Sequence, residues 1–389
     1  MKRRLSLLLL SLILILSLVA CGKSKDKDVD SGNATGNTED IKESEDNVVV
    51  DNTDYNAVVN RLIPKEKVRG IYVTGAMAGK DQLDSLIELI DKTDLNCMVI
   101  DVKDDAGNIT YDMDLDLVKE AGSVHAYIKD IDALVKKLKE HNIYLIARIV
   151  CFKDPALAAG RPELCLRLPD GSPIVDGHGN AFVNPYSEEV HKYIVEVAKK
   201  AIEDGFDEIQ FDYVRFPIGN DANNAEYGVD TTTYTRQKCI SNFFSFAERE
   251  FHKEGIVFGA DLFGTIIGSE IDEDATGQKY RDIAMKADVV CPMIYPSHYA
   301  NGNFGLEVPD AKPYEAILGA LNRSKKALSL LSDESCAIVR PWLQAFTAPW
   351  VEGHIEYDVE EVKKQIQAVY DAGYEEWILW NASNKYTYE

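Results

Sequence analysis

The sequence predicts an α/β protein in which eight parallel strands close into a single (β/α)8, or TIM, barrel. From Val68 onward, short runs rich in β-branched and aromatic residues alternate with amphipathic helical stretches. Several helical stretches end at a glycine that a strand follows directly. One barrel of about 250 residues with a long N-terminal tail accounts for the 389 residues.

The expected elements follow one another in regular alternation. Strands are predicted at 68–74, 96–103, 143–152, 206–215, 256–263, 288–295, 337–346 and 375–381. Helices are predicted at 81–92, 129–141, 187–204, 234–253, 278–286, 313–331 and 358–371. Glycines 205, 255 and 373 mark three helix ends. No eighth helix follows the last strand, so we expect a reduced one, with residues 55–62 as a candidate to fill the gap.

The first 54 residues are predicted to anchor the barrel domain, which spans 55–389. Residues 1–20 have a basic start, a long Leu and Ile run and small residues at its end, as in a secretory signal peptide. Cys21 follows directly, as in a bacterial lipobox, so we expect its lipidation; a transmembrane anchor is the alternative, but the run is marginal in length. Residues 21–54 predict a flexible acidic linker. We therefore expect a lipid-anchored protein at the cell membrane, facing the extracytoplasmic side.

Charge and composition exclude several classes of partner. The net charge of −23 argues against nucleic-acid binding and disfavours anionic polymers, which leaves neutral or cationic partners. No GxGxxG follows a strand and no CxxC occurs, so no cofactor, zinc site or redox pair is expected. A disulfide between Cys151 and Cys165 is left open. Of the seven histidines only His298 lies at a strand end, so a metal-dependent hydrolase is not expected. The oligomeric state is not predicted.

The stretch 206–217 carries polar side chains where a buried parallel strand is normally apolar. Alternation puts Gln210 and Asp212 on one face of this strand. Buried polar groups cost free energy unless they are paired or lie at an open strand end, so the pair indicates the edge of an active site. The alternative is that Asp212 only ties the sheet together through an ion pair with Arg215 or Arg148.

Several phrases spread over the chain resemble a family of bacterial glycoside-hydrolase-like proteins that long carried only a domain-of-unknown-function label. These phrases are VRGIY at 68–72, IDVKD at 100–104, VNPY at 183–186, EIQFDYVRFP at 208–217, MIYPSHY at 293–299, RPWLQ at 340–344 and LWNASN at 379–384. The resemblance implies a TIM barrel and glycosidase-like chemistry, while a shared fold alone does not grant function.

Glycoside hydrolysis needs two carboxyl groups beside the sugar carbon, and two aspartates are candidates. Asp212 closes the fourth predicted strand and Asp261 lies late in the fifth. Because these two strands are neighbours, we expect the two aspartates to lie close together near the carboxyl ends of the strands. We assign Asp212 as nucleophile or charge stabiliser, and Asp261 as general acid with its pKa raised by Phe258 and Phe263. A capping or salt-bridging role is the alternative for Asp261. Acids after the fourth and fifth strands resemble amylase-type barrels, although there the second acid is usually Glu.

Further polar and aromatic residues near strand ends are predicted to bind a hydroxyl-rich ligand. The candidates are Asp101, Arg148, Gln210, Arg215, Tyr295, His298, Trp342, Gln344 and Asn381. For Asp101 an internal ion pair with Lys103 or Arg148 is the favoured interpretation. The long segment 153–185 is expected to wall the cleft. We therefore predict a glycosidase of a cell-envelope or extracellular oligosaccharide or polysaccharide; the alternative is a non-catalytic carbohydrate-binding or scaffold lipoprotein.

Overall fold

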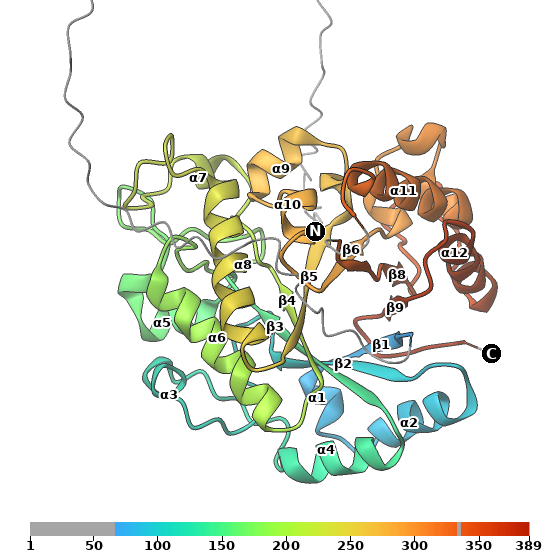
Figure 1. The fold of residues 1–389 in the computed structure, drawn as a ribbon, viewed down its shortest axis with the longest axis horizontal. Coiled ribbons are helices and arrows are strands. Elements are labelled where there is room, and N and C mark those ends of the chain that lie inside the picture. Colours follow the sequence, from blue (N-terminus) through green and yellow to red (C-terminus); the bar gives the residue numbers. More distant parts are fainter. Residues whose placement is uncertain (1–66, 333–335, 389) are drawn as a thin grey trace, which may run out of the picture. The chain divides into compact units, whose positions relative to one another are not determined.

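A closed barrel of parallel strands forms the centre of the molecule (Figure 1). The computed structural model describes residues 67–332 and 336–388. Within these residues the strands are β1 (Arg69–Val73), β2 (Cys97–Lys103), β3 (Tyr144–Val150), β4 (Glu208–Asp212), β5 (Val257–Phe263), β6 (Val289–Met293), β7 (Ile338–Val339), β8 (Trp342–Gln344) and β9 (Trp377–Trp380). β7 and β8 are two pieces of one barrel position, because both pair with β6. The pairings of β5 with β6 and of β9 with β1 close the ring, which confirms the predicted eight-stranded barrel.

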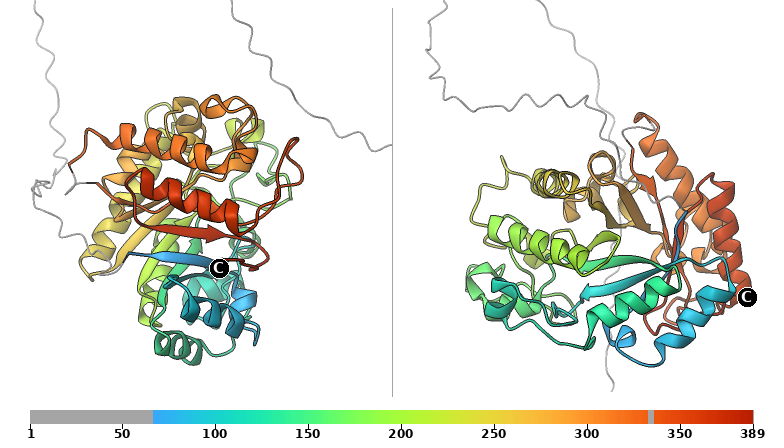
Figure 2. Two further views of the ribbon diagram at one scale, coloured as in Figure 1. Left: turned by 90° about the vertical axis from the view of Figure 1, so that its right-hand side faces the viewer. Right: turned by 60° about the horizontal axis from the view of Figure 1, so that its bottom comes forward.

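Helices surround the strands on the outside of the barrel (Figures 1 and 2). In the described part of the chain they are α1 (Gly75–Ala78), α2 (Leu83–Lys92), α3 (Asp116–Ala121), α4 (Ile131–Glu140), α5 (Pro155–Gly160), α6 (Glu188–Glu203), α7 (Asn220–Asn223), α8 (Arg236–His252), α9 (Glu270–Thr276), α10 (Tyr280–Ala284), α11 (Pro313–Leu328) and α12 (Val359–Asp371). The seven predicted helices correspond to α2, α4, α6, α8, α10, α11 and α12. Residues 1–66, with the predicted signal peptide, Cys21, the linker and the candidate helix 55–62, lie outside the described residues.

Local sequence signals explain where the helices begin and end. Ser187 and Thr235 begin α6 and α8, and each side chain accepts a hydrogen bond from a backbone N–H of the first turn. Gly205, Gly255 and Gly373 adopt positive φ angles just after helix ends, as predicted. No helix within the described ranges is long and apolar enough to cross a membrane.

The inner face of β4 links the two ends of the barrel. Glu208, Gln210 and Asp212 point inward and are buried, while Ile209 and Phe211 pack into the apolar layer under the helices. Glu208 belongs to the lower layer of the interior and Asp212 to the upper edge, where the strand ends. The alternation expected for this strand is therefore confirmed.

A β-bulge at the end of β2 changes the direction of one predicted inward side chain. The register shifts between Asp101 and Lys103, so Lys103 aligns with Ile149 of the outer face. Lys103 Nζ lies 2.8 Å from the carboxylate of Asp154, and both side chains are fully buried. Of the two ion pairs considered for Asp101, the one with Lys103 is therefore not formed, because simple alternation does not allow for the extra residue.

The segment 153–185 is ordered by its own short elements. It contains α5 and several isolated bridges, among them one between Lys153 and Phe182, whose ring is buried. Cys151 and Cys165 are both free and buried, so the disulfide left open from the sequence is not formed.

Candidate active site

Two aspartates from neighbouring strands line one cavity at the carboxyl ends of the barrel strands. Asp212 ends β4 and Asp261 lies in β5, and both border a cavity of about 190 Å³. Gln210 pairs with Gly259 and Phe211 with Ala260, so the next step of the register brings the two aspartates to the same level. Parallel strands lie about 4.8 Å apart, which makes the two acids near neighbours. The other lining residues are Asp105, Arg148, Tyr213, Arg215, Phe263, Gln278, Met293, Tyr295, His298, Trp342 and Trp380.

The carboxyl group of Asp261 is buried and held by two donors. Gln210 Nε2 and Trp342 Nε1 each donate to Asp261 Oδ1 at 2.6 Å. Among the described contacts both bonds fall on Oδ1, which leaves Oδ2 to carry a proton. Burial raises the pKa of Asp261 well above its usual range, and the charge of Asp212 raises it further, although the two donors oppose this. The arrangement favours a protonated acid.

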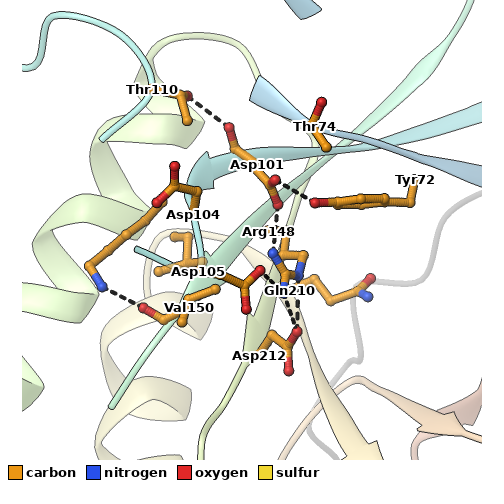
Figure 3. A network of polar contacts seen from close by, with 12 residues as sticks. Tyr72, Thr74, Asp101, Asp104, Asp105, Thr110, Arg148, Val150, Gln210 and Asp212 are labelled. Atoms are coloured by element: carbon orange, nitrogen blue, oxygen red, sulfur yellow. Dashed lines mark hydrogen bonds and ion pairs between the residues drawn. The ribbon is translucent and has the colours of Figure 1, made fainter. Parts of the chain in front are cut away.

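Asp212 lies in a different environment, because an arginine holds its carboxylate (Figure 3). Arg148 donates to Asp212 Oδ2 through Nε at 3.0 Å and through Nη2 at 2.5 Å. The same guanidinium donates through Nη1 to Asp101 Oδ1 at 2.7 Å, and Tyr72 donates to Asp101 Oδ2 at 2.6 Å. The backbone N–H of Tyr213 donates to Asp212 Oδ1 at 2.6 Å. Asp212 is therefore fixed in orientation and paired with a cation.

Two further acids of this network have shifted pKa values. Burial raises the pKa of Asp101 to about 6, although Arg148 and Tyr72 lower it. Partial burial raises the pKa of Asp105, but the positive charges of Arg148 and Lys153 outweigh this effect and lower the pKa to about 2. Asp105 is thus a charged carboxylate at the cavity, whereas Asp101 lies beneath the network with its side chain only 4% exposed.

Tyr213 turns the chain sharply where β4 ends. Its φ angle is 48°, an uncommon value for a bulky side chain, which indicates local strain. Lys153 Nζ lies 3.5 Å from the centre of its ring, and the Arg215 guanidinium lies 5.0 Å away. Residues in sparsely populated conformations cluster at active sites, and Tyr213 fits this pattern.

Comparison with known proteins identifies the family. Residues 70–386 match the sequence family described as "Putative glycosyl hydrolase domain". The chain belongs to this family. Among curated proteins no sequence matches. A hypothetical protein from Ruminiclostridium thermocellum ATCC 27405 is 35% identical, with a TM-score of 0.45 over 49% of this chain and 96% of that one.

Two solved structures of low sequence identity share the barrel fold of this glycosyl hydrolase domain. The glycoside hydrolase domain of PgaB (BpsB) from Bordetella bronchiseptica has 13% identity and a TM-score of 0.60, covering 81% of this chain and 94% of that one. The alpha-galactosidase TtGalA from Thermus thermophilus, in complex with stachyose, has 14% identity and a TM-score of 0.51, covering 82% of this chain and 62% of that one. These similarities support the fold of the domain.

Five of the predicted binding residues line the cavity of the glycosyl hydrolase domain: Arg148, Arg215, Tyr295, His298 and Trp342. Arg215 donates to the Phe216 carbonyl at 2.9 Å and, among the described ion pairs, has no acidic partner. Of the two ion pairs considered for Asp212, the one with Arg148 is therefore formed and the one with Arg215 is not. Trp342 is only 1% exposed and donates to Asp261, so it positions the acid more than it offers a face to a ligand.

Four other predicted binding residues do not line the cavity. Gln210 and Asp101 are buried beneath it and hold Asp261 and Arg148 respectively. Gln344 is fully buried, donates to Asp310 at 2.9 Å and accepts from the Ser297 N–H at 3.0 Å. The polar atoms of Gln210 and Gln344 are therefore bound by neighbouring groups of the protein, and Asp101 forms the internal ion pair with Arg148 that was favoured for it.

Asn381 also lies away from the cavity. Its Nδ2 donates to the carbonyls of Ala345 at 2.6 Å and Lys385 at 2.8 Å, and its Oδ1 accepts from Ser383. The side chain therefore organises the turn after β9 and does not line the cavity as expected. None of residues 153–185 lines the cavity either, so this segment does not form the expected wall.

Several residues that border the cavity were not selected from the sequence. Asp105 follows β2 by two residues, and a second acid after a strand end could have signalled it. Trp380 ends β9, and its ring stacks on Tyr72 with centroids 4.0 Å apart. Gln278 carries no signal in the sequence, since it follows a short helix. Phe258 was expected to raise the pKa of Asp261, but it packs outward in the apolar layer.

The site contains the groups for proton transfer and for stabilisation of a positive centre. Asp261 offers a proton, Asp212 offers a fixed carboxylate, and Tyr295 and Trp380 offer aromatic surface. Within the described ranges no group of three or more His, Cys, Asp or Glu side chains is arranged to hold a metal ion.

Proposed function

We propose that this protein is a glycosidase that uses Asp261 as general acid and Asp212 as nucleophile or charge stabiliser. The observation that carries the proposal is the contrast between two neighbouring acids at one cavity. Burial raises the pKa of Asp261, whereas Asp212 forms an ion pair with Arg148. Acids with opposed environments are the usual arrangement for acid and nucleophile in glycosidases. Membership of the glycosyl hydrolase family supports the same reaction class.

The proposed reaction begins with proton transfer from Asp261 to the glycosidic oxygen. The bond from this oxygen to the anomeric carbon breaks, and positive charge develops on the sugar ring. The Asp212 carboxylate stabilises this charge or bonds to the carbon. Water then adds to the anomeric carbon, any bond from this carbon to Asp212 breaks and frees the Asp212 carboxylate, and the Asp261 carboxylate takes up the proton that the water releases. Neighbouring strands favour the short carboxyl separation of about 5 Å of retaining enzymes.

The substrate proposed is a neutral or cationic oligosaccharide or polysaccharide outside the cytoplasm. The net charge of −23 disfavours an anionic polymer. Aromatic rings of Tyr295 and Trp380 border the cavity and suit the apolar face of a sugar ring.

A second candidate function is carbohydrate binding without turnover. One observation favours it: Arg148 and a backbone N–H already occupy both oxygens of Asp212. A carboxylate bound in this way is a weaker nucleophile than a free one. The experiment that follows separates the two functions.

Asp212→Asn and Asp261→Asn variants test the chemistry on a panel of neutral oligosaccharides and their 4-nitrophenyl glycosides. Asp212→Asn should lower kcat for both substrate types by about 10³-fold or more. Asp261→Asn should lower kcat on oligosaccharides by about 10²–10⁴-fold but much less on nitrophenyl glycosides, whose leaving group needs no proton. Release of reducing ends and of nitrophenol are the measurements, and melting curves check the fold.

The exposed Asp81→Asn variant is the matched control and should leave turnover unchanged. Full turnover by Asp212→Asn would remove this residue from the mechanism. Glycan binding by wild type without any turnover would support the binding protein instead.

We also propose that Cys21 carries a lipid that anchors the protein to the outer side of the cell membrane. The small residues that precede it after the apolar run support this. Cys21→Ser should move the protein from the membrane fraction to the soluble fraction, measured by fractionation and immunoblot, whereas Cys336→Ser should leave it in place. Retention of the Cys21→Ser variant on membranes would contradict the proposal.

A further inference from the structure

A row of aromatic side chains leads away from the cavity along the loop that follows β8. Tyr295 lines the cavity, and its ring centre lies 6.0 Å from that of Phe346. Phe346 in turn stacks against Trp350, with centroids 6.1 Å apart and an interplanar angle of 23°. The Trp350 side chain is 66% exposed. Single exposed apolar residues are common on protein surfaces, but this ring continues a row that starts inside the site.

Hydrogen bonds hold the loop that carries these rings. Gln344 Nε2 donates to the Phe346 carbonyl at 3.1 Å, and the Tyr357 N–H donates to Thr347 Oγ1 at 3.0 Å. The loop therefore presents Trp350 to solvent in a fixed position. A rigid ring loses little conformational freedom when it binds, which favours binding.

We propose that Phe346 and Trp350 form an outer subsite that stacks on the sugar units next to the unit held in the cavity. The inference rests on the proposed glycan-binding function. The cavity of about 190 Å³ is smaller than the roughly 300–1,000 Å³ of sites that enclose a whole drug-sized ligand. An oligosaccharide of several units must therefore extend beyond it. The exposed ring offers an uncharged surface that suits the apolar face of a neutral pyranose.

A chain-length series tests the outer subsite. Mono-, tri- and pentasaccharides of glucose, galactose and N-acetylglucosamine are titrated calorimetrically into the full chain. All arms carry Asp212→Asn to prevent hydrolysis. Trp350→Ala should weaken binding of tri- and pentasaccharides about tenfold and leave monosaccharide binding unchanged. Trp350→Phe should restore most of the affinity. Leu330→Ala, at another exposed apolar residue, is the matched control and should change nothing.

The outcomes separate this inference from the function on which it rests. Equal affinity of Trp350→Ala and its parent for the longer glycans would overturn the outer subsite alone. An equal loss for monosaccharides and pentasaccharides would also overturn it, because the effect would then act inside the cavity. If the parent bound none of the glycans in the series, the glycan-binding function and the outer subsite would both be overturned.

Discussion

The two ends of the barrel interior contain the same kind of charge cluster, but only the upper one borders the cavity of the candidate active site. At the lower end Arg340 donates to Glu208 at 2.6 Å and to Glu376 at 2.8 Å, and all three side chains are almost fully buried. At the upper end Arg148 joins Asp101 and Asp212 in a similar way. Strand β4 supplies one acid to each cluster, four residues apart.

The difference between the clusters shows that surroundings, rather than residue type, decide what a buried acid can do. In the lower cluster Arg340 Nη2 and Glu376 Oε1 have no hydrogen-bond partner among the described residues, and the side chains are almost fully buried. In the upper cluster Asp212 faces the cavity and has Asp261 as a neighbour. The first cluster contributes to fold and stability, whereas the second lies beside the acid pair of the candidate active site.

The largest expected effect separates the two arginines by stability. Arg340→Met leaves two acids buried without a cationic partner and should lower the free energy of unfolding by about 3–5 kcal/mol. Arg148→Met should cost less, about 1–3 kcal/mol, because water in the cavity can hydrate Asp212. Urea unfolding followed by circular dichroism measures both changes. Equal losses would show that the ends of the barrel are not electrostatically different.

A triple variant sharpens this comparison. Replacing the whole lower cluster by Glu208→Leu, Arg340→Met and Glu376→Leu removes every unpaired charge and should recover most of the stability lost in Arg340→Met. A triple variant no more stable than Arg340→Met would show that packing, rather than charge, holds the lower end together.

A smaller effect concerns the pH dependence of the upper cluster. The pKa of Asp101 is about 6 in the folded protein and near 3.9 when unfolded, so the folded state binds the proton more tightly. Its contribution to stability is fully present below pH 3.9 and is lost as pH rises through 6. The wild type should therefore lose on the order of 1–3 kcal/mol between pH 4 and 7 relative to Asp101→Asn.

Urea unfolding of both proteins at pH 4, 5, 6 and 7 checks this. Asp81→Asn, which removes an exposed carboxylate, should follow the wild-type curve. Parallel curves for wild type and Asp101→Asn would contradict a raised pKa in the upper cluster.

Local signals in the sequence predicted most of the fold. Alternation in β4 predicted the inward face with Gln210 and Asp212, and glycines predicted helix ends. The bulge that turns Lys103 outward could not be predicted, since it depends on the register with β3. In every strand of the barrel, the sequence pattern identified the element even where it missed such irregularities.

The site was predicted less completely, because partners that lie far apart in sequence decide which polar groups remain available. Gln344 was predicted at the site from its strand position, but Asp310 and Ser297 of two separate loops bind it. The pairing of Asp212 with Arg148 was predicted only as an alternative to Arg215. Asp105 was missed, since its role depends on the position of Lys153 and Arg148 across the cavity.

The interruption of the seventh barrel strand between β7 and β8 links backbone motion to the ionisation of one acid. Pro341 lies at this interruption, and β8 pairs with β6 at one position only, Met293 with Trp342. Neighbouring strands separate most readily where few backbone hydrogen bonds join them. The indole that binds Asp261 therefore belongs to a short strand that is joined to β6 by a single register pair. When β8 separates from β6, Asp261 loses the hydrogen bond from Trp342, which favours its charged form. Local opening of the barrel therefore raises the pKa of Asp261 further.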